Sequence, residues 1–107
     1  MSESNDCIFC KIAKHTMETE KILFEDADII AFLDIDQRQP GHALVIPKGH
    51  YRNLTDCPTD VLAKVIAGVK KLTQDMLAMG ATAVQVIQNN EKPMQEVFHL
   101  HFHVVPY

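Results

Sequence analysis

The chain of 107 residues has the length of one ordinary domain, which excludes two separate domains within this sequence. Hydrophobic residues make up 47% and charged residues 22%, a balance that excludes a disordered or low-complexity chain. The net charge of −4 excludes a broad basic surface for nucleic acid or an anionic membrane, so an anionic ligand requires a local site.

The beginning of the chain contains a pair of cysteines, Cys7 and Cys10, in a CxxC spacing. Three cysteines in total argue against a disulfide framework and favour a reduced pair that can bind a metal. A redox motif is the alternative, but the pair precedes the first predicted strand, which disfavours a thioredoxin-like arrangement. Since no segment has the roughly 20 apolar residues of a membrane span, we expect a cytoplasmic protein.

The first half of the chain predicts a short helix and three strands. Residues 7–14 can form one or two helical turns. Apolar and β-branched runs at 20–25 and 28–34 predict an antiparallel hairpin around Asp26-Ala27. A third strand is predicted over 41–48, between turn signals that contain Pro40 and Pro47.

A long amphipathic helix is predicted from Pro58 to Met79, because apolar residues recur there at three- and four-residue steps. Pro58 suits the first helical turn and Gly80 the C-terminal exit. The apolar stripe is widened by Val61, Gly68 and Met79. Because this stripe is wider than one small sheet can cover, we predict that the helix also contacts a second copy of the chain in a homodimer.

Two further strands are predicted at 83–88 and 99–105, with a polar loop over 89–96 between them. One long helix and a short N-terminal helix with a mostly antiparallel five-stranded sheet define an α+β fold. We expect residues 1–107 to form a single domain.

Five of the six histidines lie close to two predicted strands: His42 and His50 flank the third, and His99, His101 and His103 alternate along the last. Alternation places the last three rings on one face, with the outer pair roughly 13 Å apart. A metallohydrolase that uses all three as ligands of one metal conflicts with this distance. An imidazole titrates near pH 6.5, so the row offers a neutral nucleophile together with proton donors.

The string from His99 to Val105 resembles the alternating motif of the histidine-triad family, whose members hydrolyse or transfer nucleotides at the α-phosphorus. Other segments resemble the family in the same order: 7–12, 32–35, 41–50, 89–90 and 95–98. The resemblance covers nearly the whole chain. His103, where a transferase branch has glutamine, favours the hydrolase branches.

The resemblance implies a role for each residue of a nucleotide site. His101 would be the nucleophile that forms a transient nucleotidyl-histidine, and His103 and His42 would bind the phosphate oxygens. Asp34 would accept hydrogen bonds from the ribose hydroxyls. The phosphate cradle would comprise Asn89, Gln95, and the backbone N–H groups around Glu96 and Val97.

The resemblance also implies an apolar slot for the purine, which would accept adenine or guanine. The slot would be lined by Ile8, Phe9, Ile12, Phe32, Ile35 and Leu44. These residues could equally form ordinary core.

A structural Zn²⁺ is implied as well, with a ligand set of Cys7, Cys10, His50 and His99. Such a site would fix the N-terminal segment, which carries half of the slot, to the end of the catalytic strand.

The chain departs from the family at two positions near the cradle. Met94, after Pro93, occupies a place where glycine is common, which alters the expected approach of Gln95 to the phosphate. Glu96 replaces a serine of the phosphoramidase branch.

The leading hypothesis is a hydrolase of purine nucleoside phosphoramidates. The alternatives are a dinucleoside polyphosphate hydrolase and a zinc-stabilised nucleotide-binding adaptor. Expected partners are a small purine nucleotide and a second copy of the chain, without nucleic acid or membrane.

Overall fold

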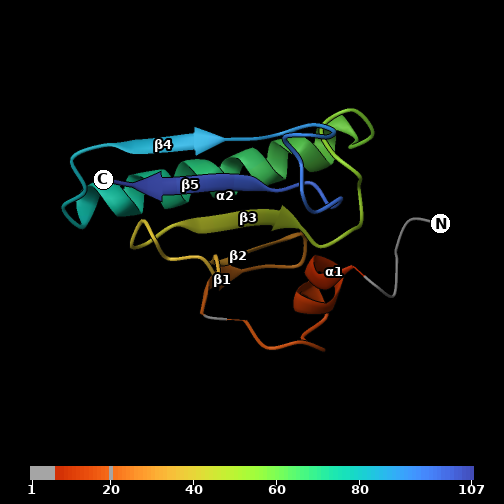
Figure 1. The fold of residues 1–107 in the computed structure, drawn as a ribbon, viewed down its shortest axis with the longest axis horizontal. Helices are drawn as coiled ribbons and strands as arrows, with labels where there is room; N and C mark the ends of the chain where they lie inside the picture. Colours follow the sequence, from red (N-terminus) through yellow and green to blue (C-terminus); the bar gives the residue numbers. More distant parts are fainter. Residues whose placement is uncertain (1–6, 20) are drawn as a thin grey trace.

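The computed structural model describes residues 7–19 and 21–107, and it shows a five-stranded antiparallel sheet with two helices (Figure 1). The strand order is β1-β2-β3-β5-β4. The elements are α1 (Ile8–Ala13), β1 (Ile22–Glu25), β2 (Ile29–Leu33), β3 (Ala43–Pro47), α2 (Thr59–Ala78), β4 (Val84–Ile87) and β5 (Phe102–Pro106). The predicted α+β class is confirmed. Residues 1–6 of the predicted domain, and Glu20 of the predicted first strand, lie outside the described residues.

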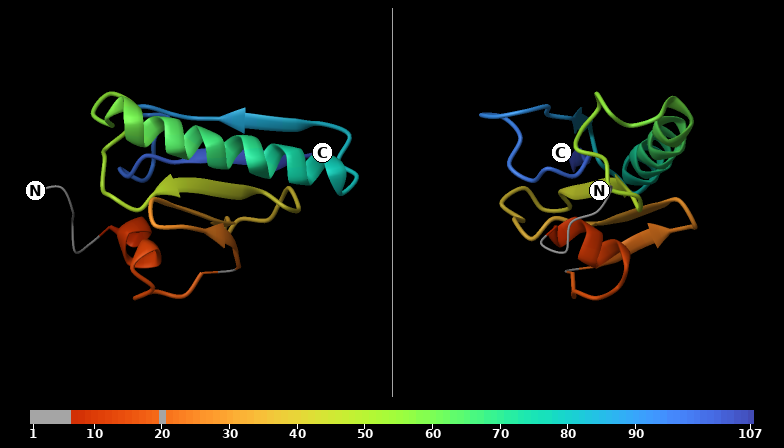
Figure 2. Two further views of the ribbon diagram at one scale, coloured as in Figure 1. Left: turned by 180° about the vertical axis from the view of Figure 1, so that it is seen from behind. Right: turned by 90° about the vertical axis from the view of Figure 1, so that its right-hand side faces the viewer.

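The two helices lie on opposite faces of the sheet (Figure 2). Successive side chains of β2 and β3 alternate between the faces, so each strand contributes to two apolar clusters. The cluster against α2 includes Ile29, Ala31, Val45, Val65, Leu72 and Leu100. The cluster against α1 includes Phe9, Ile12, Ile30, Phe32, Leu44 and Ile46. The second cluster lies on the face that carries the histidines.

The long helix α2 agrees closely with the prediction, although Pro58 is the residue before the helix and not part of its first turn. Gly80, with a φ of 111°, follows the helix, as a left-handed exit requires. Gly68 differs from the expectation: it is buried, and a Cβ there would lie 2.4 Å from Ile29 Cδ1. Gly68 therefore permits close packing of α2 on the sheet and does not widen an outer stripe.

The last strand was predicted to begin at His99, but β5 begins at Phe102. The backbone before it pairs elsewhere: the Leu100 N–H donates to the Tyr51 carbonyl oxygen at 2.7 Å. The segment that carries His99 and His101 therefore lies beside the chain that leaves β3. The other four predicted strands are each shorter at their ends than expected. No helix in the described ranges has the length and apolar character needed to cross a bilayer.

Candidate active site

Three imidazoles from neighbouring strands form one cluster. His42 precedes β3, His103 lies in β5, and the pairing of these strands brings His42 Nε2 to 2.9 Å from His103 Nδ1. The ring centroids of His101 and His103 are 5.0 Å apart. The predicted catalytic histidines therefore lie together on the α1 face of the sheet.

The ring of His101 has a defined tautomer. Its Nδ1 lies 2.7 Å from the His99 carbonyl oxygen, and since a carbonyl only accepts, Nδ1 carries the hydrogen. The lone pair of His101 is consequently on Nε2, which makes no hydrogen bond within the described part of the chain. Burial lowers the pKa of His101, a residue that is 7% exposed, so the neutral form dominates at pH 7. A neutral imidazole with a free Nε2 is a nucleophile.

The other two histidines form a hydrogen-bonded pair. One of the two facing nitrogens of His42 and His103 donates, and the other accepts. Burial, together with the neighbouring His101 and His42, lowers the pKa of His103 to about 4. The Asp34 carboxylate lies 3.6 Å from His42 Nε2, which places an acidic group at the edge of the cluster.

An apolar cleft of about 500 Å³ adjoins the histidines on the α1 side. It is lined by all six predicted slot residues, Ile8, Phe9, Ile12, Phe32, Ile35 and Leu44, together with Asp34 and Val97. Ile35 is 83% exposed and Ile8 is 42% exposed, so these two form the rim.

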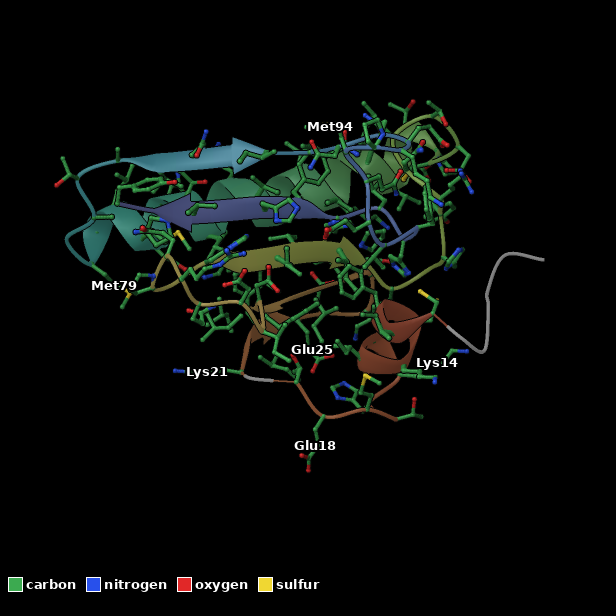
Figure 3. The ribbon with its side chains drawn as sticks, in the orientation of Figure 1. Lys14, Glu18, Lys21, Glu25, Met79 and Met94 are labelled. Carbon is green, nitrogen blue, oxygen red and sulfur yellow. The ribbon has the colours of Figure 1, made fainter. Side chains whose placement is uncertain are left out.

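Phe9 connects this cleft to the histidine cluster. Its ring packs edge-on against Phe32 at 5.7 Å and against His101 at 5.1 Å between centroids. Met17, Glu18 and Thr19 also line the cleft and were not predicted, because they lie in a segment without regular structure. In Figure 3 the labelled Glu18 extends away from the body of the molecule, so its exposed carboxylate lies at the cleft's outer side.

The predicted metal ligands also converge. Cys7, Cys10, His50 and His99 have ligand atoms that all lie within 4.8 Å of one another. His50 Nδ1 is 3.1 Å from Cys10 Sγ, and His99 Nδ1 is 3.4 Å from both sulfur atoms. Tetrahedral zinc with two sulfur and two nitrogen ligands requires S···N separations of about 3.5 Å. The donor set therefore fits Zn²⁺.

Two contacts around these ligands favour metal binding. His99 Nε2 lies 2.9 Å from the Pro47 carbonyl oxygen, so Nε2 carries the hydrogen and Nδ1 presents its lone pair to the sulfur atoms. The Cys10 backbone N–H donates to Cys7 Sγ at 3.4 Å, which orients this sulfur atom toward the other ligand atoms. His99 therefore contacts both clusters. Its ring faces the sulfur atoms of Cys7 and Cys10, and its carbonyl oxygen accepts the hydrogen bond from His101 Nδ1.

Gln95 is placed differently from the expectation that it binds phosphate. Its side chain is buried, and its carbonyl oxygen accepts from Asn53 Nδ2 at 3.1 Å and from the Glu91 N–H at 2.8 Å. Its amide nitrogen donates to the carbonyl oxygens of Arg52 and Val97 at 2.7 and 3.0 Å. All four hydrogen-bonding positions of the amide are used inside the protein. The Gln95 side chain therefore joins the segments of Arg52, Asn53, Glu91 and Val97.

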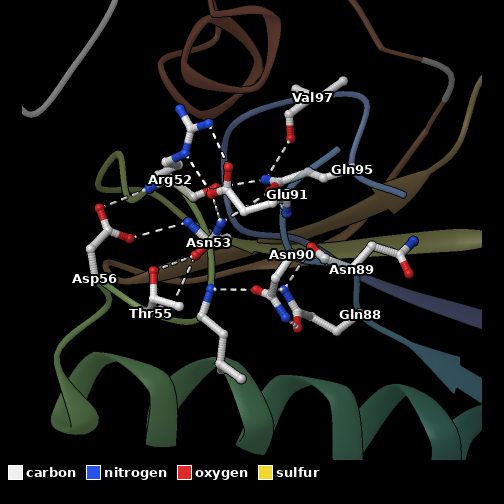
Figure 4. A network of polar contacts seen from close by, with 11 residues as sticks. Arg52, Asn53, Thr55, Asp56, Gln88, Asn89, Asn90, Glu91, Gln95 and Val97 are labelled. Atoms are coloured by element: carbon white, nitrogen blue, oxygen red, sulfur yellow. Dashed lines mark hydrogen bonds and ion pairs between the residues drawn. The ribbon is translucent and has the colours of Figure 1, made fainter. Parts of the chain in front are cut away.

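The other predicted cradle residues, Asn89, Glu96 and Val97, lie in the segment between β4 and β5. Figure 4 shows the Asn89 side chain turned away from the polar contacts around Gln95. The backbone N–H groups of Glu96 and Val97 donate no hydrogen bond within the described residues. Met94 is 65% exposed and lies at the outer side of the loop (Figure 3). The loop has its left-handed residue at Glu91, with a φ of 69°, and so requires no glycine at 94.

Sequence reasoning missed Arg52, Asn53 and Glu91, which join the loop after β3 to the loop after β4. Asn53 is fully buried, although nothing local in the sequence distinguishes it from an exposed loop residue. Its partners lie 38 and 42 positions later in the chain, beyond the reach of any periodicity.

Comparison with known proteins gives a consistent result. The HIT domain family matches residues 15–107. An adenosine 5′-monophosphoramidase of Saccharomyces cerevisiae is 43% identical over 101 residues, which are 94% of this chain and 61% of that longer protein. A crystal structure of a HIT-like protein from Bartonella henselae has a TM-score of 0.89 at 41% identity, over 98% of this chain and 81% of that one.

A Zn-bound histidine triad family protein from Mycobacterium smegmatis also resembles the chain, with a TM-score of 0.88 at 34% identity, over 94% of this chain and 74% of that one.

Proposed function

Because the chain belongs to the histidine-triad (HIT) family, we propose that it is an enzyme that hydrolyses purine nucleoside 5′-phosphoramidates at the α-phosphorus. The observation that carries this proposal is the tautomer of His101. Its Nδ1 hydrogen is committed to a backbone carbonyl, and its Nε2 is left with a lone pair beside two further imidazoles. The 43% identical yeast relative is named as an adenosine 5′-monophosphoramidase, which supports this substrate class.

The first chemical step is attack of His101 Nε2 on the α-phosphorus. As the new N–P bond forms, the P–N bond to the leaving amine breaks, and the amine departs after taking up a proton. The His99 carbonyl oxygen stabilises the positive charge that develops on the His101 ring, because it accepts the Nδ1 hydrogen. Water then attacks the phosphorus, and the nucleoside monophosphate and free His101 are released.

The surrounding groups bind the rest of the substrate. The hydrogen-bonded pair of His42 and His103 presents an N–H group to the phosphate oxygens, and Asn89 with the N–H groups of Glu96 and Val97 supplies further donors. Asp34 lies between the histidine cluster and the apolar cleft, where its carboxylate accepts hydrogen bonds from the ribose hydroxyls. The cleft's apolar walls hold a purine ring by its faces, with little distinction between adenine and guanine.

A structural Zn²⁺ at Cys7, Cys10, His50 and His99 is part of the proposal. When bound, the ion would join Cys7 and Cys10, at the start of α1, to His50 after β3 and to His99 before β5. Its role would be structural, because four protein ligands would leave no position open to a substrate.

A homodimer is also part of the proposal, with a contact surface that includes the edge strand β4. The outer edge of β4 is unpaired within the described chain, and Val86 and Ile87 expose 45% and 36% of their surface there. An exposed apolar edge strand is suited to pairing with a second copy. Ile66 and Leu77 on α2 are exposed as well.

The experiment that tests this function is hydrolysis of adenosine 5′-phosphoramidate by the wild-type protein and by His101→Ala. We expect turnover by the wild type and a loss of at least about 1,000-fold in the variant, since the nucleophile is removed. A diadenosine polyphosphate is assayed in parallel, because a higher kcat/KM for it would favour a dinucleoside polyphosphate hydrolase. Binding of AMP without turnover of either compound would favour the adaptor alternative.

A further inference from the structure

Glu91, in the loop that leads from β4 to the histidines, takes no part in the proposed chemistry, but its carboxylate accepts three hydrogen bonds from the loop after β3. Its carboxylate accepts hydrogen bonds from Arg52 Nε at 2.7 Å and Arg52 Nη2 at 2.8 Å. It also accepts one from Asn53 Nδ2 at 2.6 Å. These donors follow β3, so the carboxylate joins two loops that are distant in sequence (Figure 4).

The contacts of Glu91 continue into the protein. Asn53 Nδ2 also donates to Gln95 Oε1, which in turn accepts the Glu91 N–H. We call Arg52, Asn53, Glu91 and Gln95 the loop clasp. The Arg52 guanidinium additionally lies 4.2 Å from the centroid of the Phe98 ring, immediately before His99. The clasp therefore holds the loop at both of its ends.

The backbone of the loop shows that this arrangement is specific. Glu91 has a φ of 69°, a conformation that side chains rarely adopt unless the surrounding contacts impose it. From this residue the chain turns tightly, with the N–H groups of Met94 and Gln95 donating to the Glu91 carbonyl oxygen at 3.2 and 3.0 Å. Glu96 and Val97 follow directly, so their N–H groups are positioned by the turn.

We propose that Glu91 is a positioning residue that, through the loop clasp, fixes the N–H groups of Glu96 and Val97 for the transferring phosphoryl group. This inference rests on the proposed function. Donors aimed at charge that develops in the transition state act only where their position is fixed in advance. A carboxylate that holds them therefore affects the chemical step more than it affects binding of the nucleoside.

The test compares the zinc-loaded wild type with Glu91→Ala and Glu91→Gln, using adenosine 5′-phosphoramidate as substrate. We expect Glu91→Ala to lower kcat about tenfold with KM within about twofold, because displaced donors reduce mainly transition-state stabilisation. Glu91→Gln keeps an acceptor for Asn53 and should retain an intermediate kcat. Asp75→Asn is the matched control: it breaks the exposed Lys71–Asp75 ion pair on α2 and should leave kcat unchanged.

Hydrogen exchange of the amides of residues 94–98 separates positioning from general stability. We expect exchange there to be about tenfold faster in Glu91→Ala, with the amides of α2 unchanged, because local opening of the loop becomes easier. If Glu91→Ala does not fold, the same two measurements on Glu91→Gln decide the question. An unchanged kcat, or a raised KM at unchanged kcat, would overturn the inference.

The outcomes also separate this inference from the proposed function. A wild type that hydrolyses no nucleotide would contradict the proposed function. Hydrogen exchange of residues 94–98 in the wild type and in Glu91→Ala would still test whether the loop clasp fixes this segment. Equal exchange of residues 94–98 in the wild type and Glu91→Ala would overturn the positioning role, whatever the activity.

Discussion

The carbonyl oxygen of His99 accepts the Nδ1 hydrogen of His101 at 2.7 Å, while the ring of His99 faces the sulfur atoms of Cys7 and Cys10. One residue therefore belongs to both the cysteine cluster and the histidine cluster. The His99 carbonyl oxygen fixes the tautomer of His101, so a displacement of His99 is expected to disturb the His101 ring. The proposed zinc site thus acts on the proposed nucleophile through a single peptide group.

Loss of a zinc ligand should consequently reduce zinc content and thermal stability together. We expect Cys7→Ser to contain clearly less zinc than the wild type and to unfold at a lower temperature, because metal binding contributes to folding free energy. Metal analysis and thermal unfolding measure the two effects. Cys57→Ser is the control, since Cys57 lies outside the ligand cluster. Equal zinc in Cys7→Ser and the wild type would contradict the ligand assignment.

The dependence of activity on pH follows from the burial of His101. Burial lowers the pKa of His101 below its ordinary value of 6.5, so the ring stays neutral and nucleophilic at pH 7 and loses activity only as it becomes protonated at lower pH. The acidic limb of kcat/KM should therefore lie below pH 6.5. A profile of kcat/KM against pH measures it. A limb centred above pH 7 would be inconsistent with a buried neutral nucleophile.

Ribose recognition is assigned to Asp34. A charged acceptor contributes on the order of 1.5–3 kcal/mol to a hydrogen bond, so a substrate with a 2′-hydroxyl should react roughly 10- to 100-fold faster than its 2′-deoxy form. Asp34→Asn should remove most of this preference. The ratio of kcat/KM for the two substrates is the measurement, and Asp36→Asn serves as the control. Retention of the full ratio in Asp34→Asn would place the ribose elsewhere.

The proposed dimer predicts a different response at the two edges of the sheet. Val86→Glu puts a charge on β4 and should give a monomer, because a charged edge strand disfavours pairing with a second copy. Ile22→Glu puts the same charge on β1, the opposite edge, and should leave the dimer intact. Light scattering after size-exclusion chromatography reports the mass of each. A monomeric wild type would refute the dimer.

Much of this arrangement was predictable from sequence because it depends on short-range periodicity. The two-residue spacing of His99, His101 and His103 placed the rings on one face even though β5 begins only at Phe102. The start of the strand was wrong because Leu100 pairs with Tyr51, a contact that alternation does not encode. A hydrogen bond across half the chain leaves no local pattern.

Gln95 shows a second limit of sequence reasoning. The resemblance implied that its side chain binds phosphate, and the structure shows that side chain bonded to Asn53 and to the Glu91 N–H, contacts that no local sequence pattern predicts. The six residues of the apolar slot, in contrast, were expected from the resemblance to the histidine-triad family, and one cleft brings all six together.

The covalent step can be observed directly by rapid acid-free quenching of the protein during turnover of adenosine 5′-phosphoramidate, followed by peptide mass spectrometry. The account predicts an adenylyl group on the peptide that contains His101, attached to that residue and absent from His101→Ala. Turnover without any labelled peptide, or a label on another histidine in the wild type, would contradict it.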